Sequence, residues 1–136
     1  MNHWLIKSEP SAYSWDQFVK DKQTFWSGVR NYAARNNLKA MKKGDLAFFY
    51  HSNEGLCIVG IAKVIKEYTP DKTATEGEWY GVDFAPFKAL KNPVTLAQIK
   101  AEPVLKNMEI IKLSRLSVSK VSDKEFDKIL LMSQTK

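Results

Sequence analysis

Cysteine and histidine are almost missing from this chain of 136 residues, in which Cys57, His3 and His51 are the only ones. A single cysteine excludes an internal disulfide framework and any zinc site built from several thiolates, and it suits a reducing compartment. Two histidines far apart in the sequence give no metal-ligand spacing, and no glycine-rich phosphate loop is present. We therefore expect no bound metal and no other cofactor.

Long apolar runs are also absent. The longest, "LAFFY" and "CIVGIA", are too short to cross a bilayer, and the amino terminus "MNHWLIKSEP" has no basic segment followed by an apolar run. We therefore expect a soluble protein that is not exported and has no membrane contact, located in the cytoplasm, or in the nucleus if the source is eukaryotic. The length and an apolar content of 44% fit a single domain over residues 1–136, which we expect to be a monomer.

Arginine is scarce in a chain that is otherwise basic. The formal net charge is +6, yet only three of the 21 basic residues are arginine: Arg30, Arg35 and Arg115. A basic charge favours a polyanionic partner, although charge alone is weak support for one. Lysine supplies simple positive charge elsewhere, which suggests that arginine is kept for positions that need its planar, bidentate guanidinium. Two of the three arginines fall in one stretch, "FWSGVRNYAARNN", over residues 25–37.

The spacing of apolar residues predicts strands and helices that alternate along the chain. Strands are expected over residues 3–7, 45–52, 55–68, 78–87, 110–113 and 116–121, and helices over residues 14–22, 30–41, 96–102 and 123–132. Ser14 with Gln17, Thr95 with Gln98, and Ser122 with Glu125 have the spacing of capping boxes. Apolar residues on both faces of residues 56–65 indicate a strand buried on two sides. The predicted fold class is α+β, a small β-barrel flanked by helices.

Residues 30–41 divide into two faces when they are placed on a helix. Ala34, Leu38 and Met41 form an apolar face, and the opposite face consists of Asn31, Tyr32, Arg35, Asn36 and Lys39. A polar face of this kind can simply meet solvent, but a solvated face in this chain would be expected to carry lysine and glutamate. Asparagine amides and arginine forks read base edges and phosphates, and aromatic rings stack on bases. We therefore interpret the polar face as a nucleic-acid contact surface.

Several blocks of sequence, taken in order, resemble the EVE domain. They are "WLIKSEPSAYSW", "WSGVRNYAARNNLKAMKKGD", "FFYHS", "IVGIAKV", "PDKTA", "WYGVDF", "PVTL" and "RLSV", and they cover residues 4 to about 130. The resemblance implies a PUA-like fold, which is a small β-barrel flanked by helices. It also implies binding to DNA or RNA that carries modified bases, cytosine modifications especially.

A second resemblance, to the YTH domain, implies a mechanism. That domain is also PUA-like, reads methylated adenine in an aromatic cage, and has a similar order of "LIKS", "WS", a strand pair and a tryptophan-containing strand. The resemblance makes Trp26 and Trp79 the walls that sandwich a methylated or hydroxymethylated base. The full expected base pocket is Ser8, Trp26, Ser27, His51, Trp79 and Asp83. The expected nucleic-acid contacts are Lys7, Arg30, Asn31, Tyr32, Arg35, Asn36, Arg115 and Ser117.

Tryptophan in a small domain usually lies in the core, and this alternative applies to each of the four in this chain. We expect Trp4 and Trp15 to be core residues. Trp26 is expected in the pocket because it stands beside Gly28 and just ahead of the polar helix. For Trp79 the core and the pocket remain equally open.

An enzyme is the alternative function. If residues 53–55 close a hairpin, His51 pairs with Cys57 across two strands, which would place an imidazole beside the only thiol and form a Cys–His dyad. Free cysteine in an apolar strand usually acts as a small buried hydrophobe instead. We therefore favour a binding protein without catalytic residues.

Overall fold

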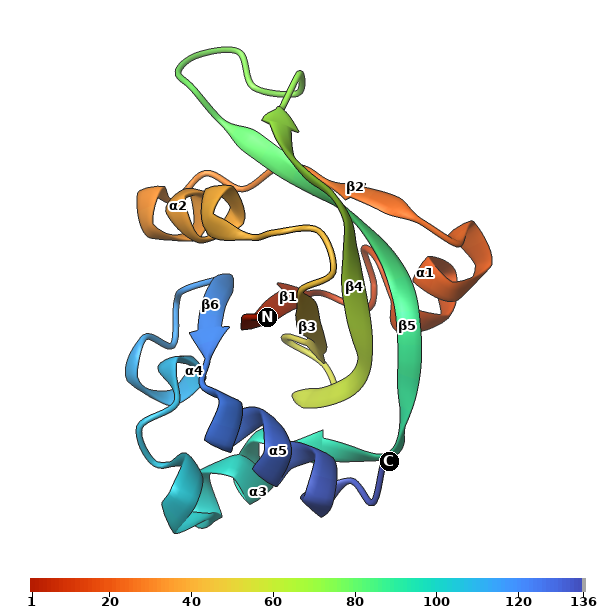
Figure 1. Cartoon of the computed structure of the whole chain (residues 1–136), viewed down its shortest axis with the longest axis vertical. Helices are drawn as coiled ribbons and strands as arrows, with labels where there is room; N and C mark the ends of the chain where they lie inside the picture. The colour runs from red at the N-terminus through yellow and green to blue at the C-terminus, as the bar shows by residue number, and fades with distance from the viewer. Residues whose placement is uncertain (136) are drawn as a thin grey trace.

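The computed structural model describes residues 1–135, in which six strands alternate with five α-helices and one 3-10 turn (Figure 1). The strands are β1 (His3–Ser8), β2 (Thr24–Trp26), β3 (Leu46–His51), β4 (Cys57–Pro70), β5 (Tyr80–Thr95) and β6 (Val118–Val121). The helices are α1 (Trp15–Asp21), α2 (Tyr32–Ala40), α3 (Leu96–Ala101), α4 (Glu109–Lys112) and α5 (Asp123–Met132), and the 3-10 turn covers Pro103–Leu105. No helix in this part of the chain is long and apolar enough to span a membrane. The predicted mixture of helices and strands is confirmed.

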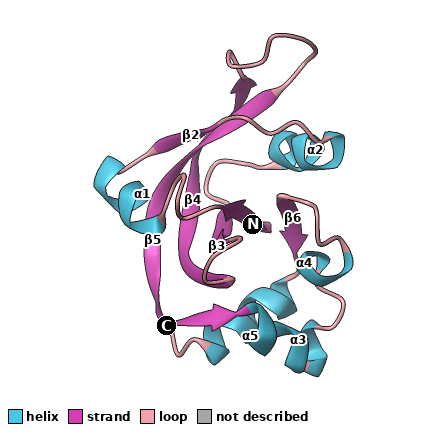
Figure 2. Ribbon diagram, turned by 180° about the vertical axis from the view of Figure 1, so that it is seen from behind, coloured by secondary structure: helices cyan, strands magenta, loops and turns pink. Residues whose placement is uncertain are grey.

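The strands pair in the order β2-β5-β4-β3-β1-β6, with β1 and β3 parallel and the other neighbours antiparallel. Both faces of the sheet are buried, because Trp4 and Ile6 belong to one apolar cluster while Leu5 between them belongs to another. The first cluster includes residues of α1 and α2, and the second includes residues of α3, α4 and α5. Figure 2 shows α3, α4 and α5 grouped together, away from α1 and α2. In β4 the adjacent residues Ile61 and Ala62 are both buried, which confirms the predicted strand buried on two sides.

The sheet is not closed into a barrel, since β2 and β6, its two edges, do not pair with each other in the described residues. Helix α2 lies between β6 and β5 and contacts both (Figure 1). The side-chain amide of Asn37 on α2 donates a 2.7 Å hydrogen bond to the Val118 carbonyl oxygen of β6. A helix therefore covers the edge that barrel closure would have paired. The predicted small β-barrel is not confirmed, and the strands form an open sheet flanked by helices.

The capping residues predicted from the sequence mark the starts of three helices, α1, α3 and α5. Thr95 and Ser122 are the N-caps of α3 and α5, and both reciprocal capping boxes form as predicted. The hydroxyl of Ser14 accepts the Gln17 N–H at 3.1 Å, but the Gln17 side chain donates to Asp21 at 2.8 Å instead of returning to the cap. The third capping box is therefore only half formed.

The strand predicted over residues 110–113 is wrong, because Glu109–Lys112 form α4. The run "IIKL" is too short for its apolar spacing to separate a strand from a helix. The N–H groups of Ile111 and Lys112 both bond to the Met108 carbonyl, and Ile110 is buried. One helical turn therefore buries the side chain that suggested a strand.

Candidate nucleic-acid interface

A cavity of about 440 Å³ opens where the end of β1, the turn after it, β2 and the loop before α2 meet. Six of the residues predicted to bind a nucleic acid line it. They are Ser8, Trp26 and Ser27 from the expected base pocket, and Lys7, Arg30 and Ser117 from the expected contacts. Segments far apart in the sequence thus bring half of the expected pocket together.

The backbone of β2 places Trp26 at this cavity. β2 pairs antiparallel with β5, and Trp26 stands opposite Val82. A Cβ atom on Gly81 would lie 2.5 Å from both the Trp26 carbonyl oxygen and the Phe25 ring. Only glycine therefore allows β2 to approach β5 so closely at this point.

The Trp26 ring is held by three neighbouring rings. It lies nearly perpendicular to Tyr13, Phe49 and Phe84, at centroid distances of 6.3, 5.7 and 5.9 Å and interplanar angles of 75°, 85° and 85°. The side chain is only partly buried and packs against the first apolar cluster. Trp26 is therefore both a core contact and a cavity wall whose orientation is fixed by packing.

Two polar side chains at the cavity already have protein partners. The Ser8 hydroxyl donates to the Tyr13 carbonyl oxygen at 2.5 Å, which leaves its oxygen lone pairs to accept from a ligand. The Lys7 ammonium donates to the Ser114 carbonyl oxygen at 2.7 Å, and burial lowers the pKa of Lys7. The remaining N–H groups of Lys7 can donate to a base or to a phosphate.

Asp71, which is not among the predicted site residues, organises the rim of the cavity. Its side chain has no exposed area and accepts hydrogen bonds from the Gly28 N–H at 2.8 Å, Arg30 Nη1 at 3.1 Å, the Thr73 N–H at 2.9 Å and the Thr73 hydroxyl at 2.6 Å. Burial raises the pKa of Asp71, but these hydrogen bonds outweigh burial and hold the pKa well below its usual range. The carboxylate is therefore charged and ties the loop after Trp26 to the loop after β4.

The sequence "PDKT", residues 70–73, is compatible with one of these hydrogen bonds, the one between Asp71 and Thr73. An aspartate whose carboxylate accepts the N–H two residues later forms an Asx turn, and Asp71 does this with Thr73. The partners Gly28 and Arg30 lie 43 and 41 residues earlier, so the sequence gives no local sign of them.

A second hollow of about 360 Å³ lies beside the first, lined by Asn31, Ala33, Leu113, Ser114, Arg115 and Leu116. It brings together two more predicted contacts, Asn31 and Arg115. Asn31 is the N-cap of α2, and its Oδ1 accepts the Ala34 N–H at 3.0 Å. The Asn31 amide nitrogen is therefore the group left to donate to a ligand, while Arg115 offers an exposed guanidinium.

Trp79 does not line the cavity. Its ring stacks on Tyr32 with 5.2 Å between centroids and an interplanar angle of 20°. The guanidiniums of Arg30 and Arg35 lie 5.7 and 5.6 Å from the centre of the Trp79 ring. The structure therefore does not bring Trp26 and Trp79 together as facing walls. Asn36, another predicted contact, accepts from Arg35 at 3.3 Å beside this stack.

Asp83 and His51 also lie outside the cavity. Asp83 pairs with Phe25 across β2 and β5, and it is half-buried. His51 sits at the end of β3, where its Nε2 accepts the Trp15 N–H at 3.1 Å. Trp4 and Trp15 are buried, as expected for core tryptophans.

The cross-strand pairing of His51 with Cys57 is confirmed. Burial raises the pKa of Cys57 and lowers the pKa of His51. An activated cysteine needs a lowered thiol pKa, so the raised value disfavours a nucleophile. The Nε2 lone pair of His51 is also occupied by the Trp15 N–H.

Residues 2–132 match the family model described as the EVE domain. The chain belongs to this family. The resemblance inferred from the sequence blocks is thereby confirmed. Thymocyte nuclear protein 1 of Gallus gallus is 36% identical in an alignment 168 residues long, gaps included, and the alignment covers 98% of this chain and 69% of that protein. The protein of the same name in Homo sapiens is 35% identical in an alignment 167 residues long, gaps included, and the alignment covers 98% of this chain and 74% of that protein.

Two solved structures of other proteins have the same fold. A crystal structure of a protein from Agrobacterium tumefaciens matches with a TM-score of 0.96 and 43% identity over 99% of this chain and 94% of that one. The crystal structure of human THYN1 in complex with 5-methylcytosine containing DNA matches with a TM-score of 0.92 and 34% identity, over 100% of this chain and 99% of that one.

Proposed function

We propose that this EVE domain binds DNA carrying a methylated or hydroxymethylated base and holds that base in the cavity beside Trp26. The observation that carries the proposal is the cavity itself, in which Trp26, Ser8, Ser27, Lys7 and Arg30 converge. Support comes from the match over the whole chain to human THYN1 in complex with 5-methylcytosine containing DNA. This complex also favours DNA over RNA as the partner.

The chemistry of the cavity suits an extruded base. A base that leaves its stack loses a few kcal/mol of stacking energy, and one indole face restores about 1 to 3 kcal/mol. The volume of about 440 Å³ falls in the range of small-ligand sites. A methyl group adds about 0.8 kcal/mol when it is buried against apolar surface, which corresponds to a few-fold preference for the modified base.

The polar residues divide into two roles. Ser8 and Ser27 bond to the base edge, with Ser8 accepting because its proton is already committed to Tyr13. The sugar-phosphate backbone is held across the two adjoining hollows by Lys7, Asn31, Arg115 and Ser117. Arg30 contributes charge at the rim in a fixed orientation, since its guanidinium is already bonded to Asp71 and Thr73.

The proposed pocket does not include three of the residues expected from the sequence. Trp79, Asp83 and His51 do not line the cavity, so a sandwich of the base between Trp26 and Trp79 is replaced by a single wall at Trp26. The chain acts by binding alone in this proposal, because the Cys57 thiol has a raised pKa and His51 is engaged with the Trp15 backbone. The monomeric state and the cytoplasmic or nuclear location expected from the sequence belong to the same proposal.

A binding experiment on matched oligonucleotides tests the function. Two DNA oligonucleotides that differ only in one 5-methylcytosine are titrated with the protein by fluorescence anisotropy. We expect tighter binding to the methylated strand, and we expect Ser27→Ala to reduce affinity for both because it removes a contact to the base edge. Ser52→Ala is the control, since Ser52 does not line the cavity. Equal binding of both oligonucleotides by the unaltered protein would refute the proposal.

A further inference from the structure

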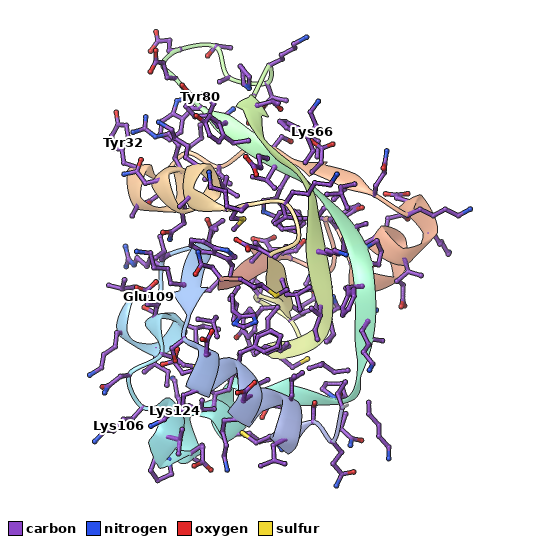
Figure 3. All side chains as sticks on the ribbon, viewed as in Figure 1. Tyr32, Lys66, Tyr80, Lys106, Glu109 and Lys124 are labelled. Atoms are coloured by element: carbon purple, nitrogen blue, oxygen red, sulfur yellow. The ribbon has the colours of Figure 1, made fainter. Side chains whose placement is uncertain are left out.

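Tyr32 is a large aromatic residue that the fold leaves in solvent. It is the first residue of α2, and 67% of its surface is exposed. Figure 3 shows it at the outer margin of the molecule, near the end of α2 that follows the cavity loop. The free energy of folding gains little from a side chain in this position.

The ring of Tyr32 is nevertheless supported from behind. Trp79 stacks on it with 5.2 Å between centroids. The guanidinium carbon of Arg35 lies 4.9 Å from the centre of the Tyr32 ring and 5.6 Å from that of Trp79. Trp79 and Arg35 thus support the ring, while 67% of the residue stays exposed. We call the side of the ring that faces solvent, away from Trp79, the bare face of Tyr32.

The supporting side chains are themselves anchored. Arg35 Nη1 donates to the Glu78 carbonyl oxygen at 3.1 Å, which joins α2 to the residue before Trp79. Arg30 lies 5.7 Å from the centre of the Trp79 ring and is bonded to the buried carboxylate of Asp71. The bare face of Tyr32 therefore belongs to a preorganised aromatic surface, with the Arg35 guanidinium beside Tyr32 and the Arg30 guanidinium beside the Trp79 ring that supports it.

This surface adjoins the proposed base site. Arg30 lines the cavity, and Asn31 and Ala33 line the second hollow. Tyr32 stands between these residues in the chain and is linked to the cavity rim through Trp79 and Arg30. A nucleotide next to one held in the cavity would thus come close to Tyr32.

Other exposed aromatic rings lack this combination. Tyr68 is 41% exposed but meets Tyr80 edge-on at 80°, with the Lys39 ammonium 5.8 Å from its centre. Phe87 is 52% exposed, and Lys63 lies over its ring at 5.9 Å. Tyr32 is therefore the best candidate in residues 1–135 for stacking on an external planar group.

We propose that the bare face of Tyr32 stacks on the DNA base next to the modified base. This inference rests on the proposed function, because extrusion of one base uncovers a face of its neighbour. An uncovered face costs stacking energy that an aromatic ring restores. Trp26 then receives the modified base, Tyr32 covers the adjacent one, and Arg30 and Arg35 are placed near the intervening backbone.

A cycle of variants and abasic ligands tests this role. DNA oligonucleotides with one 5-methylcytosine are prepared intact, or with an abasic site replacing the 5′ or the 3′ neighbour. We expect Tyr32→Ala to weaken binding of the intact oligonucleotide by about 5- to 150-fold, the range that corresponds to one base-aromatic stack. Tyr32→Phe should bind like the unaltered protein. For one of the two abasic oligonucleotides, the unaltered protein and Tyr32→Ala should bind equally.

Each contrary result is distinct. If the unaltered protein does not prefer the methylated oligonucleotide, the proposed function fails and this inference fails with it. If that preference is present but Tyr32→Ala binds the intact oligonucleotide normally, only the role of Tyr32 is refuted. A loss in Tyr32→Ala that is equal for the intact and both abasic oligonucleotides would overturn stacking as well. Tyr68→Ala is the matched control, an exposed tyrosine with no stacked support, and should bind unchanged.

Discussion

The Asp71 carboxylate accepts a 2.8 Å hydrogen bond from the backbone N–H of Gly28, a residue 43 positions earlier in the chain. Gly28 has a φ of +82°, which glycine adopts without strain, and it follows Trp26 by two residues. The same carboxylate holds the Arg30 guanidinium at 3.1 Å. One buried charge therefore fixes both the loop that carries the cavity wall and an arginine at its rim.

Removal of this carboxylate should destabilise the fold strongly. Asp71→Ala leaves the Gly28 and Thr73 N–H groups without their acceptor, and each group that stays buried and unsatisfied costs about 1 to 3 kcal/mol. The Arg30 guanidinium is 38% exposed, so its loss of a partner adds little to this cost. Urea unfolding followed by tryptophan fluorescence measures the difference. Asp123→Ala is the matched control, because Asp123 is 83% exposed in its pair with His3 and should change the free energy of unfolding by about 1 kcal/mol or less. Equal effects of the two substitutions would refute the role given to Asp71.

The dependence of the free energy of unfolding on pH, at acid pH, provides a second test of the same residue. The pKa of Asp71 is below its usual range in the folded state, so its contribution is present above the unfolded pKa of about 3.9 and is lost as pH falls further. The difference in unfolding free energy between the unaltered protein and Asp71→Asn should be constant from pH 7 to about 5. It should narrow below about pH 4. A gap that stays constant to pH 3 would contradict a charged, hydrogen-bonded carboxylate.

Local signals in the sequence predicted α1, α2, α3 and α5 but not the short α4, and long-range contacts explain what was missed in the site and in the sheet. The capping boxes at Thr95 and Ser122 formed because each involves residues three positions apart. Placing Trp79 required the Tyr32 ring, and the role of Asp71 required Gly28, and neither partner is near in sequence. The open sheet was missed because its edge is covered by Asn37 of a helix, which strand patterns do not reveal.

Trp26 and Trp79 should respond differently to truncation. Trp26 touches three rings and the core, so Trp26→Ala should cost about 3 kcal/mol of folding stability. Trp79→Ala removes a stack at the surface and should cost about 0.5 to 1.5 kcal/mol. Urea unfolding of both variants gives the comparison. A Trp26→Ala protein as stable as the unaltered one would show that the ring is not held by the core.

Cys57 should be a slow target for alkylation. Burial raises its thiol pKa, so the reactive thiolate forms only above the ordinary cysteine value of about 8.5. Iodoacetamide labelling of the native protein, followed by mass spectrometry between pH 6 and 10, gives the rate profile. Cys57→Ala should retain DNA binding. Rapid labelling near pH 7 would instead revive the Cys57–His51 dyad.

Arg115 should contribute a contact to phosphate that carries no sequence information. Arg115→Ala is expected to weaken binding of methylated and unmethylated oligonucleotides equally, and to reduce the slope of log affinity against log salt by about 1. Anisotropy titrations at several salt concentrations measure both effects. Lys124→Ala, an exposed charge at the α5 end of the molecule, serves as the control (Figure 3). An unchanged slope for Arg115→Ala would remove it from the phosphate contacts.

The position of the modified base is the central claim, and an isotope-labelled methyl group tests it most directly. A DNA oligonucleotide with a ¹³C-labelled methyl on one 5-methylcytosine is bound to the protein, and nuclear Overhauser effects from that methyl are recorded. We expect cross-peaks to the Trp26 ring and a methyl resonance shifted by the indole ring current. The Trp26 assignment is checked with Trp26→Phe, which should lose those cross-peaks. A bound methyl group with no contact to Trp26, or with contacts to Trp79 and Tyr32 instead, would contradict the account.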